Sequence, residues 1–413
     1  MRMRTIVAVA LSALAVTWAT EARAQKEPVR IGVLLPQTGP FAANGKDMQN
    51  GIVMFFEEQH YKMAGRDIKL LIEDTAANPA IGLTKARSLV EAQGAQVLIG
   101  PLNAAVGYAL APYITEKKIP SIYPIVSADD ITQRKRSPYI IRTGWASSQP
   151  SQPFGQWVWD NLHYKKIATI GYDFAFGWEV VGGFQRTYEL AGGEVVQKLW
   201  TPQGTADFGP YIAQLRRDVD AVFAQFSGAD ALRFSKQYQE AGLKGRLPLI
   251  GGGTFTDEHV LRSMGDEVLG VITPLHYSGV LTNPANKKFA ALYEAKYHQV
   301  PSYYSEGGYV AGMVFKAALD AVHGNAEDKE ALLAAIRKVN MSDAPRGPFT
   351  IDAYNNPIEN IYIRKVEKVN GKLQNTVIYT FPKVSQFWKW TPEEFLKNPV
   401  YSRDFPPCKF CGK

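Results

Sequence analysis

The chain alternates short apolar runs with segments of helical spacing, and this alternation restricts its fold more than any other feature. Between residues 29 and 127 four apolar runs, each ended by Gly, Pro or polar residues, are separated by amphipathic segments. Such runs predict buried strands, and apolar residues three to four positions apart predict helices. Strands that alternate with helices form a parallel sheet covered on both faces. We therefore predict an α/β fold with doubly wound parallel sheets.

The alternation pauses in a Ser-, Gln- and Pro-rich loop over residues 139–155 and then starts again, which predicts a second lobe of the same kind. A chain of 413 residues is long enough for two domains. Three helical patterns after residue 280 have no strands of their own, and we expect them to cover the first lobe. Asn370-Gly371 predicts the turn of a late hairpin. The expected parts are a first lobe of residues 25–143 and 275–346, a second lobe of residues 144–274 and 347–385, and a surface tail of residues 386–413.

Residues 1–24 have the composition of a secretory leader. A basic start, MRMR, precedes a short apolar run, and the small-x-small triplet Ala22-Arg23-Ala24 precedes Gln25. The apolar run is too short to remain as a membrane span, and no Cys follows it to carry a lipid anchor. We expect a protein that is exported to the periplasm without a lipid anchor.

The charge of the chain gives little support for nucleic-acid binding. The formal net charge is +7, and the basic residues are scattered except for the cluster QRKRS at residues 133–137. A nucleic-acid interface needs a denser basic patch. We interpret the cluster as a short exposed loop and expect no nucleic-acid partner.

The two cysteines, Cys408 and Cys411, form one CxxC near the C-terminus. A single CxxC lacks the four ligands of a structural zinc site, and it does not open a helix after a strand as a redox motif does. In an oxidising compartment we expect a local disulfide, with a free thiol pair as the alternative.

The sequence contains none of the common catalytic or cofactor motifs. GxSxG, HExxH and GxxxxGK[ST] are absent, the six histidines lack metal-ligand spacing, and the triple glycine at 251–253 does not match GxGxxG. We therefore predict no catalytic residue, no cofactor and no metal. Asp173, Glu179 and Glu306 remain candidates for acid–base chemistry in a cleft.

The segment from Ala95 to Pro112 is the clearest candidate for a ligand-binding element. AQVLIGP predicts a strand, and the residues after it predict a helix with Asn103 as its N-cap. The turn between them directs unpaired backbone N–H groups, at about Ala104 to Val106, beyond the end of the strand. The helix dipole adds partial positive charge, so the position suits a carboxylate. The same pattern also fits an ordinary strand-to-helix turn.

Serine residues follow two other predicted strands. Ser127, three residues before Asp130, is placed as the N-cap of a capping box. Its hydroxyl is equally placed to hold a carboxylate together with Ala104, and a hydroxyl can do both because it is donor and acceptor. Ser227 is placed in the same way, as a cap or as a ligand-binding group.

Aromatic and amide side chains complete the set of candidates. Phe176 follows a predicted strand of the second lobe, where it is either core or cleft wall. Tyr303 and Tyr304 precede a predicted helix and can face either lobe, and Asn44 follows the first strand in a predicted turn. An aromatic cleft with few polar groups suits a partly apolar small molecule.

Taken in order, several motifs resemble the periplasmic solute-binding proteins of branched-chain amino acid ABC transporters, the Leu/Ile/Val-binding type. They are VRIGVLLPQTGPFAANGKDMQNG, LIGPLNAAV, IPSIYPIVSADD followed by YIIRT, GYDFAFG and SEGGYVAG, and the resemblance covers residues 29–381. It implies the type I periplasmic-binding-protein fold, with two lobes joined by a multi-strand hinge. It also implies a binder without enzymatic activity and an ABC permease of the inner membrane as its partner.

The resemblance assigns ligand-binding positions, and the chain departs from the family pattern at three of them. In amino-acid-binding members the loops after the third and fourth strands hold the ligand's carboxylate, which maps to Asn103-Ala104 and Ser127. The usual hydroxyl residue at the first place is Ala104 here, and the aromatic of the second lobe, often Tyr, is Phe176. The ammonium-binding acidic residue falls at Gly253, and no carboxylate stands within two residues of it.

A buried ammonium group without a carboxylate partner is strongly unfavourable. We therefore predict an amino-less ligand, a small aromatic or apolar carboxylate, which a monomeric binding protein captures in the cleft and delivers to an ABC importer. The alternatives are a branched-chain or other amino acid as ligand, a periplasmic sensor subunit for the same ligand, and an exported enzyme that uses a cleft carboxylate.

Overall fold

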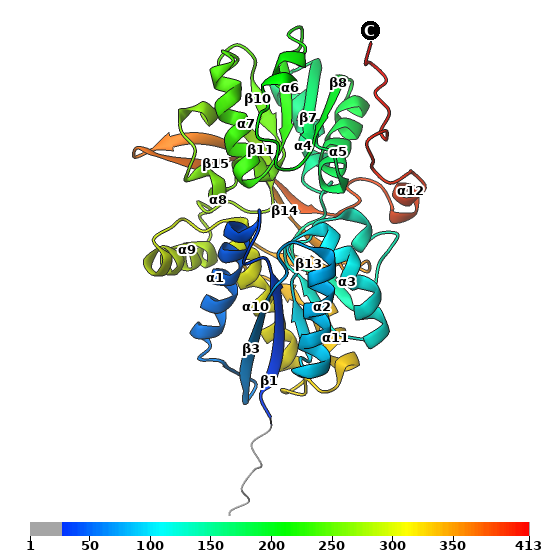
Figure 1. Cartoon of the computed structure of the whole chain (residues 1–413), viewed down its shortest axis with the longest axis vertical. Coiled ribbons are helices and arrows are strands. Elements are labelled where there is room, and N and C mark those ends of the chain that lie inside the picture. The colour runs from blue at the N-terminus through cyan, green and yellow to red at the C-terminus, as the bar shows by residue number, and fades with distance from the viewer. Residues whose placement is uncertain (1–26, 413) are drawn as a thin grey trace, which may run out of the picture.

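The computed structural model describes residues 27–412, which form two α/β lobes stacked end to end with a waist between them (Figure 1). The predicted leader lies outside the described residues. Between residues 27 and 412 no helix is long and apolar enough to cross a membrane.

The first lobe is built on a six-stranded sheet in the order β2-β3-β1-β4-β5-β6. All pairings in it are parallel except that of β2 with β3. Its elements are β1 (Val29–Leu35), α1 (Ala42–Glu58), β2 (Lys62–Met63), β3 (Arg66–Asp74), α2 (Pro79–Arg87), β4 (Val97–Ile99), α3 (Ala104–Lys117), β5 (Ser121–Tyr123) and β6 (Ile140–Arg142).

Three later helices pack on this lobe, as the sequence predicts: α9 (Pro284–Tyr297), α10 (Tyr303–Ala321) and α11 (Lys329–Arg337). The crossing of α1 and α10 is so close that a Cβ atom on Gly51 would lie 1.8 Å from the carbonyl oxygen of Ser305. Only glycine fits there. The N-terminal end of α10 is therefore held firmly against the first lobe.

The second sheet has nine strands, in the order β12-β13-β14-β11-β10-β9-β7-β8, with β15 paired to β14. Strands β7 to β11 pair in parallel, and the others pair antiparallel. Its parallel part contains α4 (Ser151–Leu162), β7 (Lys166–Tyr172), α5 (Ala175–Ala191), β8 (Glu194–Thr201), α6 (Gly209–Gln214), β9 (Ala221–Gln225), α7 (Gly228–Glu240), β10 (Leu249–Gly251), α8 (Glu258–Leu261) and β11 (Ile272–Leu275).

The antiparallel strands are β12 (Asn340–Met341), β13 (Phe349–Ile351), β14 (Pro357–Val369) and β15 (Lys372–Val384). The backbone of both Asn370 and Gly371 has positive φ, 50° and 78°, which matches the predicted hairpin turn. The chain crosses the waist between β6 and α4, between β11 and α9, and between α11 and β14 (Figure 1). This is the type I periplasmic-binding-protein fold with its multi-strand hinge.

One local expectation is wrong, and another holds only in part. The strand expected over residues 119–127 is only three residues long, because Pro120 and Pro124 flank it and proline has no N–H for the ladder. The basic cluster at 133–137 is a turn as expected, with Lys135 and Arg136 exposed, but Gln133 and Ser137 are buried. Arg134 pairs with Asp130, so only part of the cluster's positive charge faces solvent.

The described part of the tail, residues 386–412, packs on the second lobe and reaches the first. Its short helix α12 (Pro392–Leu396) belongs to a small buried aromatic cluster, and the guanidinium of Arg186 on α5 lies 3.7 Å from the ring centre of Trp390. Arg134 of the first lobe donates a hydrogen bond of 2.6 Å to the carbonyl oxygen of Asn398. Cys408 and Cys411 form the expected disulfide.

Candidate functional site

A small cavity lies between the lobes. Its volume is about 50 Å³, which exceeds the roughly 10–15 Å³ that one water molecule needs. The cavity is lined by Phe41, Leu102, Asn103, Ala104, Ile125, Ser127, Phe174, Phe176, Ser227, Tyr303 and Tyr304. Six of the eight predicted site residues are in this set: Asn103, Ala104, Ser127, Phe176, Ser227 and Tyr303.

Five helices begin at the wall of this cavity. Phe41, Asn103, Phe174 and Ser227 are the N-cap residues of α1, α3, α5 and α7, and Tyr303 is the first residue of α10. The N-terminus of a helix carries partial positive charge and unpaired N–H groups. Their convergence makes the cavity favourable for an anion, although no Lys or Arg lines it.

The N-terminus of α3 is shaped as predicted, with one correction. Asn103 is the N-cap, and its side chain accepts hydrogen bonds from the backbone N–H groups of Ala105 and Val106, at 2.8 and 3.3 Å. Two of the N–H groups expected to be free are therefore occupied. The N–H of Ala104 has no partner among the described residues and remains available to a ligand.

Ser127 is not a helix cap. The short 3-10 turn after it begins at Asp129, its N-cap residue is Ala128, and no side chain caps it. The Ser147 hydroxyl instead lies 3.0 Å from Ser127 Oγ and 2.9 Å from the Ser127 carbonyl oxygen. The capping box is wrong because Asp130 turns away to pair with Arg134. With Ser147 as donor, the Ser127 hydroxyl proton is free to point into the cavity.

Ser227 occupies the N-cap position of α7, yet its side chain makes no capping bond. Its backbone is fixed by the Tyr172 hydroxyl, which contacts both its N–H and its carbonyl oxygen. The Ser227 hydroxyl is therefore a second neutral group that faces the cavity.

The remaining walls are mainly aromatic. Phe176 lines the cavity and packs against Phe174 and Trp145, with ring centres 6.3 and 6.0 Å apart. Tyr303 and Tyr304 stack with ring centres 4.0 Å apart. Burial raises the pKa of both hydroxyls above the ordinary value, so both stay neutral.

Asn44 and Gly253 do not line the cavity. Asn44 lies inside α1 rather than in a turn and is buried beside Gly228 of the second lobe. Gly253 is enclosed: its carbonyl accepts a 2.6 Å hydrogen bond from Arg364, and a Cβ atom on it would lie 2.3 Å from the carbonyl oxygen of Pro274. The position at which the resemblance expects an acidic side chain has no room for any side chain.

No carboxylate lines the cavity. Of the three candidates for acid–base chemistry, Glu306 forms a buried ion pair with Arg346 and Asp173 pairs with Arg403. Glu179 is buried on α5 and does not line the cavity. Asp257, which the sequence analysis did not single out, lies behind Tyr303. Its two oxygens accept hydrogen bonds from the backbone N–H groups of Tyr303 and His259, and it does not line the cavity.

The model of the periplasmic binding protein family matches residues 28–372. The chain belongs to this family. It is a periplasmic substrate-binding protein of the kind that serves ABC transporters. The tail lies beyond the end of the family match.

Relatives cover nearly the whole chain. The Leu/Ile/Val-binding protein homolog 6 of Brucella melitensis is 30% identical over 383 residues, which is 91% of this chain and 97% of that protein. A solute-binding protein from Rhodopseudomonas palustris BisB5, solved with 3,4-dihydroxybenzoic acid, is 33% identical, with a TM-score of 0.83 over 87% of this chain and 98% of its own. Another from R. palustris, solved with benzoate, is 31% identical, with a TM-score of 0.80 over 87% and 97%.

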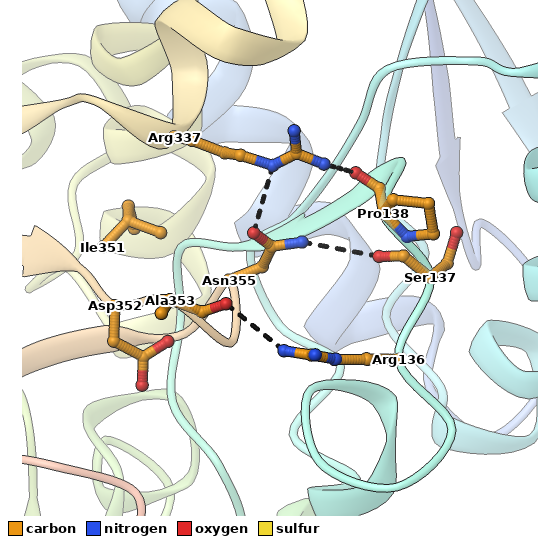
Figure 2. Close-up of a pocket in the computed structure, with 8 residues that line it drawn as sticks. All are labelled: Arg136, Ser137, Pro138, Arg337, Ile351, Asp352, Ala353 and Asn355. Carbon is orange, nitrogen blue, oxygen red and sulfur yellow. Dashed lines mark hydrogen bonds between the residues drawn. The ribbon is translucent and has the colours of Figure 1, made fainter.

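A second cavity of about 460 Å³ lies where the basic cluster meets α11 and the loop before β14 (Figure 2). Its guanidinium groups are hydrogen-bonded to the protein: Arg136 donates to the Ala353 carbonyl, and Arg337 donates to Asn355 and Pro138. These contacts fasten the cluster to the hinge segment, and we assign the cavity no ligand.

Proposed function

We propose that the family member described here captures a small aromatic monocarboxylate in the interlobe cavity and delivers it to an ABC importer. The observation that carries this proposal is the cavity itself, which combines five helix N-termini, aromatic walls and no charged side chain. Such a site favours one delocalised negative charge on an apolar body.

The carboxylate end fits the first lobe. The free N–H of Ala104 and the hydroxyl of Ser127 lie at the ends of neighbouring strands and can each donate to one carboxylate. The ring of the ligand then lies against Phe176 and Tyr303. An ammonium group finds no acidic partner in this cavity, which disfavours an α-amino acid.

The known ligands of related proteins agree with this assignment. The two R. palustris proteins were solved with benzoate and with a dihydroxybenzoic acid, and both exceed 30% identity to this chain. The Brucella relative carries a name for branched-chain amino acid binding, so leucine is the ligand to test against.

The hinge suggests how the ligand is captured, by movement of one lobe against the other. We propose that residues 25–143 with 275–346 move as one lobe against residues 144–274 with 347–385, after export directed by the leader. Because both lobes contribute to the cavity, the closed state makes contacts with the ligand that the open state lacks. A permease that recognises only the closed arrangement of the lobes then binds only protein that carries ligand.

A thermal-shift and calorimetry panel tests the ligand class. Benzoate at 100 times its dissociation constant should stabilise the protein by about 2.7 kcal/mol, and leucine, valine and dicarboxylates should give no shift. Strong stabilisation by leucine with none by benzoate would overturn the proposal. Chemical change of the bound acid would indicate an enzyme instead.

Ser127→Ala tests the carboxylate end. Loss of one hydrogen bond to a charged group should weaken benzoate binding by about 1.5–3 kcal/mol, measured by titration calorimetry. Ser263→Ala, at an exposed serine, is the matched control and should leave affinity unchanged. Unchanged affinity in Ser127→Ala would remove this serine from the site.

A further inference from the structure

Two polar rings lie directly behind the cavity wall, on two of the segments that cross the waist. Trp145 follows β6 and His276 follows β11, and their ring centres are 6.1 Å apart. Both rings lie about 6 Å from that of Tyr303, at 6.2 and 6.0 Å, and Trp145 also lies 6.0 Å from Phe176. Tyr303 and Phe176 line the cavity, so the pair forms the layer behind them on the hinge side.

The polar atoms of this pair are buried and unpaired. Trp145 is 2% exposed and His276 is 1% exposed. Neither Trp145 Nε1 nor either ring nitrogen of His276 has a hydrogen-bond partner among the described residues. The next residues along the chain differ, since Tyr277 donates to Asn286 and Ser278 donates to the Asn375 carbonyl. Unpaired buried polar atoms are uncommon and unfavourable, so three such nitrogen atoms close together indicate that a hydrogen-bonding group binds to them.

The surroundings keep His276 neutral. Burial is the main cause that lowers its pKa well below the ordinary value, and the charges of Arg346 and Arg364 lower it further. Arg346 is held by Glu306 and Glu359, and Arg364 donates to the Gly253 and Tyr277 carbonyls. A neutral imidazole offers one donor and one acceptor, and the indole of Trp145 offers a donor. This combination complements a hydroxyl group, which donates one hydrogen bond and accepts others.

We propose that Trp145 and His276 form a second polar end of the ligand site, which takes a hydroxyl group of the ligand. The inference rests on the proposed function and narrows it to hydroxylated aromatic monocarboxylates. The carboxylate lies at Ala104 and Ser127, the ring passes between the aromatic walls, and the hydroxyl donates to the unprotonated nitrogen of His276 and accepts from Trp145 Nε1. Phe176, which is only partly buried, turns aside to admit the ring.

Calorimetry with the whole mature protein at pH 7 tests this subsite, with benzoate, 3-hydroxybenzoate and 4-hydroxybenzoate as probes. At least one hydroxybenzoate should bind wild-type protein tenfold or more tightly than benzoate. Trp145→Phe and His276→Leu should each cut that preference to below threefold. Trp159→Phe, which removes an indole N–H on α4 beside Tyr188, is the matched control and should keep the full preference.

A measurement on the wild-type protein alone tests the inference even if the variants do not fold. With ¹⁵N-labelled histidine, the ring nitrogen signals of His276 should shift on addition of the preferred hydroxybenzoate and not on addition of benzoate. Equal binding of benzoate and both hydroxybenzoates, or a preference that survives both substitutions, would overturn the inference and leave the proposed function intact. Failure of all three acids to bind would overturn the proposed function itself.

Discussion

Two clusters of ionisable side chains join the lobes, and one pairs opposite charges whereas the other brings like charges together. In the first, which we term the Asp47 cluster, Asp47 of α1 lies 2.6 Å from Arg262 and 3.0 Å from His259, both of the α8 segment, and accepts a 2.9 Å hydrogen bond from Ser302. Helices α1 and α8 lie on the left of the waist in Figure 1. Burial raises the pKa of Asp47, but these partners lower it more, so the net pKa lies below the ordinary value.

The second cluster is the Asp129–Glu179 pair, which joins the turn after β5 in the first lobe to α5 in the second. Asp129 follows β5, Glu179 belongs to α5, and both are almost completely buried. One oxygen of each carboxyl group has no partner among the described residues. Burial raises the pKa of both groups, and the charge of Asp129 raises that of Glu179 further, while Arg142 opposes the shift.

If the two lobes close on a ligand as proposed, the interface between them contains two opposite responses to pH. The Asp47 cluster needs an ionised carboxylate, so its contribution to closure is present above the ordinary Asp pKa and is lost as pH falls through the lowered value. The Asp129–Glu179 pair needs a proton, so its contribution is complete below the ordinary carboxyl pKa and is lost as pH rises through the raised values. Ligand affinity should therefore pass through a maximum on the acid side of neutrality.

The largest effect should come from the Asp129–Glu179 pair. Glu179→Gln mimics the protonated state, so affinity at pH 8 should rise, and the fall of affinity with pH, up to about 1.4 kcal/mol per pH unit, should become smaller because only Asp129 still titrates. Calorimetry in two buffers of different ionisation enthalpy should show proton uptake on ligand binding in wild-type protein and less in the variant. Glu240→Gln, exposed on α7, is the control. A wild-type affinity that is flat between pH 5 and 8 would show that the pair does not titrate on closure.

A smaller effect of opposite sign is expected from Asp47→Asn. Removing the charge that holds Arg262 and His259 should weaken ligand binding by roughly 1–2 kcal/mol, between the values for exposed and buried ion pairs. It should also reduce the loss of affinity below about pH 4, leaving only the part caused by protonation of the ligand's own carboxylate, which a titration from pH 3 to 6 measures. Asp160→Asn, at an exposed position of α4, should do neither. If the acid-side loss were as large in Asp47→Asn as in the wild-type protein, Asp47 would make no contribution to it.

The smallest effect should be that of Arg262→Gln. The side chain of Arg262 is 27% exposed and shares Asp47 with His259 and Ser302, so the remaining partners compensate in part. We expect a loss below about 1 kcal/mol that shrinks further at 0.5 M salt because exposed charges are screened. A larger loss of affinity that is independent of salt would mean that this contact is as fully shielded from solvent as the Asp129–Glu179 pair.

The fold follows closely from local sequence patterns. Apolar runs and helical spacing are properties of contiguous residues, and Asn103 is a cap for reasons that lie within three residues of it. The capping box at Ser127 failed because its outcome depends on Ser147 and Arg134, which a spacing rule does not include. Pro120 and Pro124, by contrast, were local signals that would have corrected the length of β5.

The site was predictable only as far as it depends on strand ends. Six of its residues follow predicted strands or open predicted helices, and the rule that ligands bind beyond the strand ends of such sheets brings them together. Trp145 and His276 come from separate crossings of the waist and meet only in the folded chain. Asp47 and Arg262 are likewise 215 residues apart in the sequence.

The enclosure of Gly253 has a consequence for how this scaffold can change its specificity. Every other amino acid carries a Cβ atom, which here would meet the main chain of β11 at 2.3 Å. No point mutation at this position can therefore introduce the acid that an amino group requires, whether by drift or by saturation mutagenesis. A lineage or an engineer that seeks amino-acid binding must first reshape the turn between β10 and β11, or recruit a carboxylate from another wall.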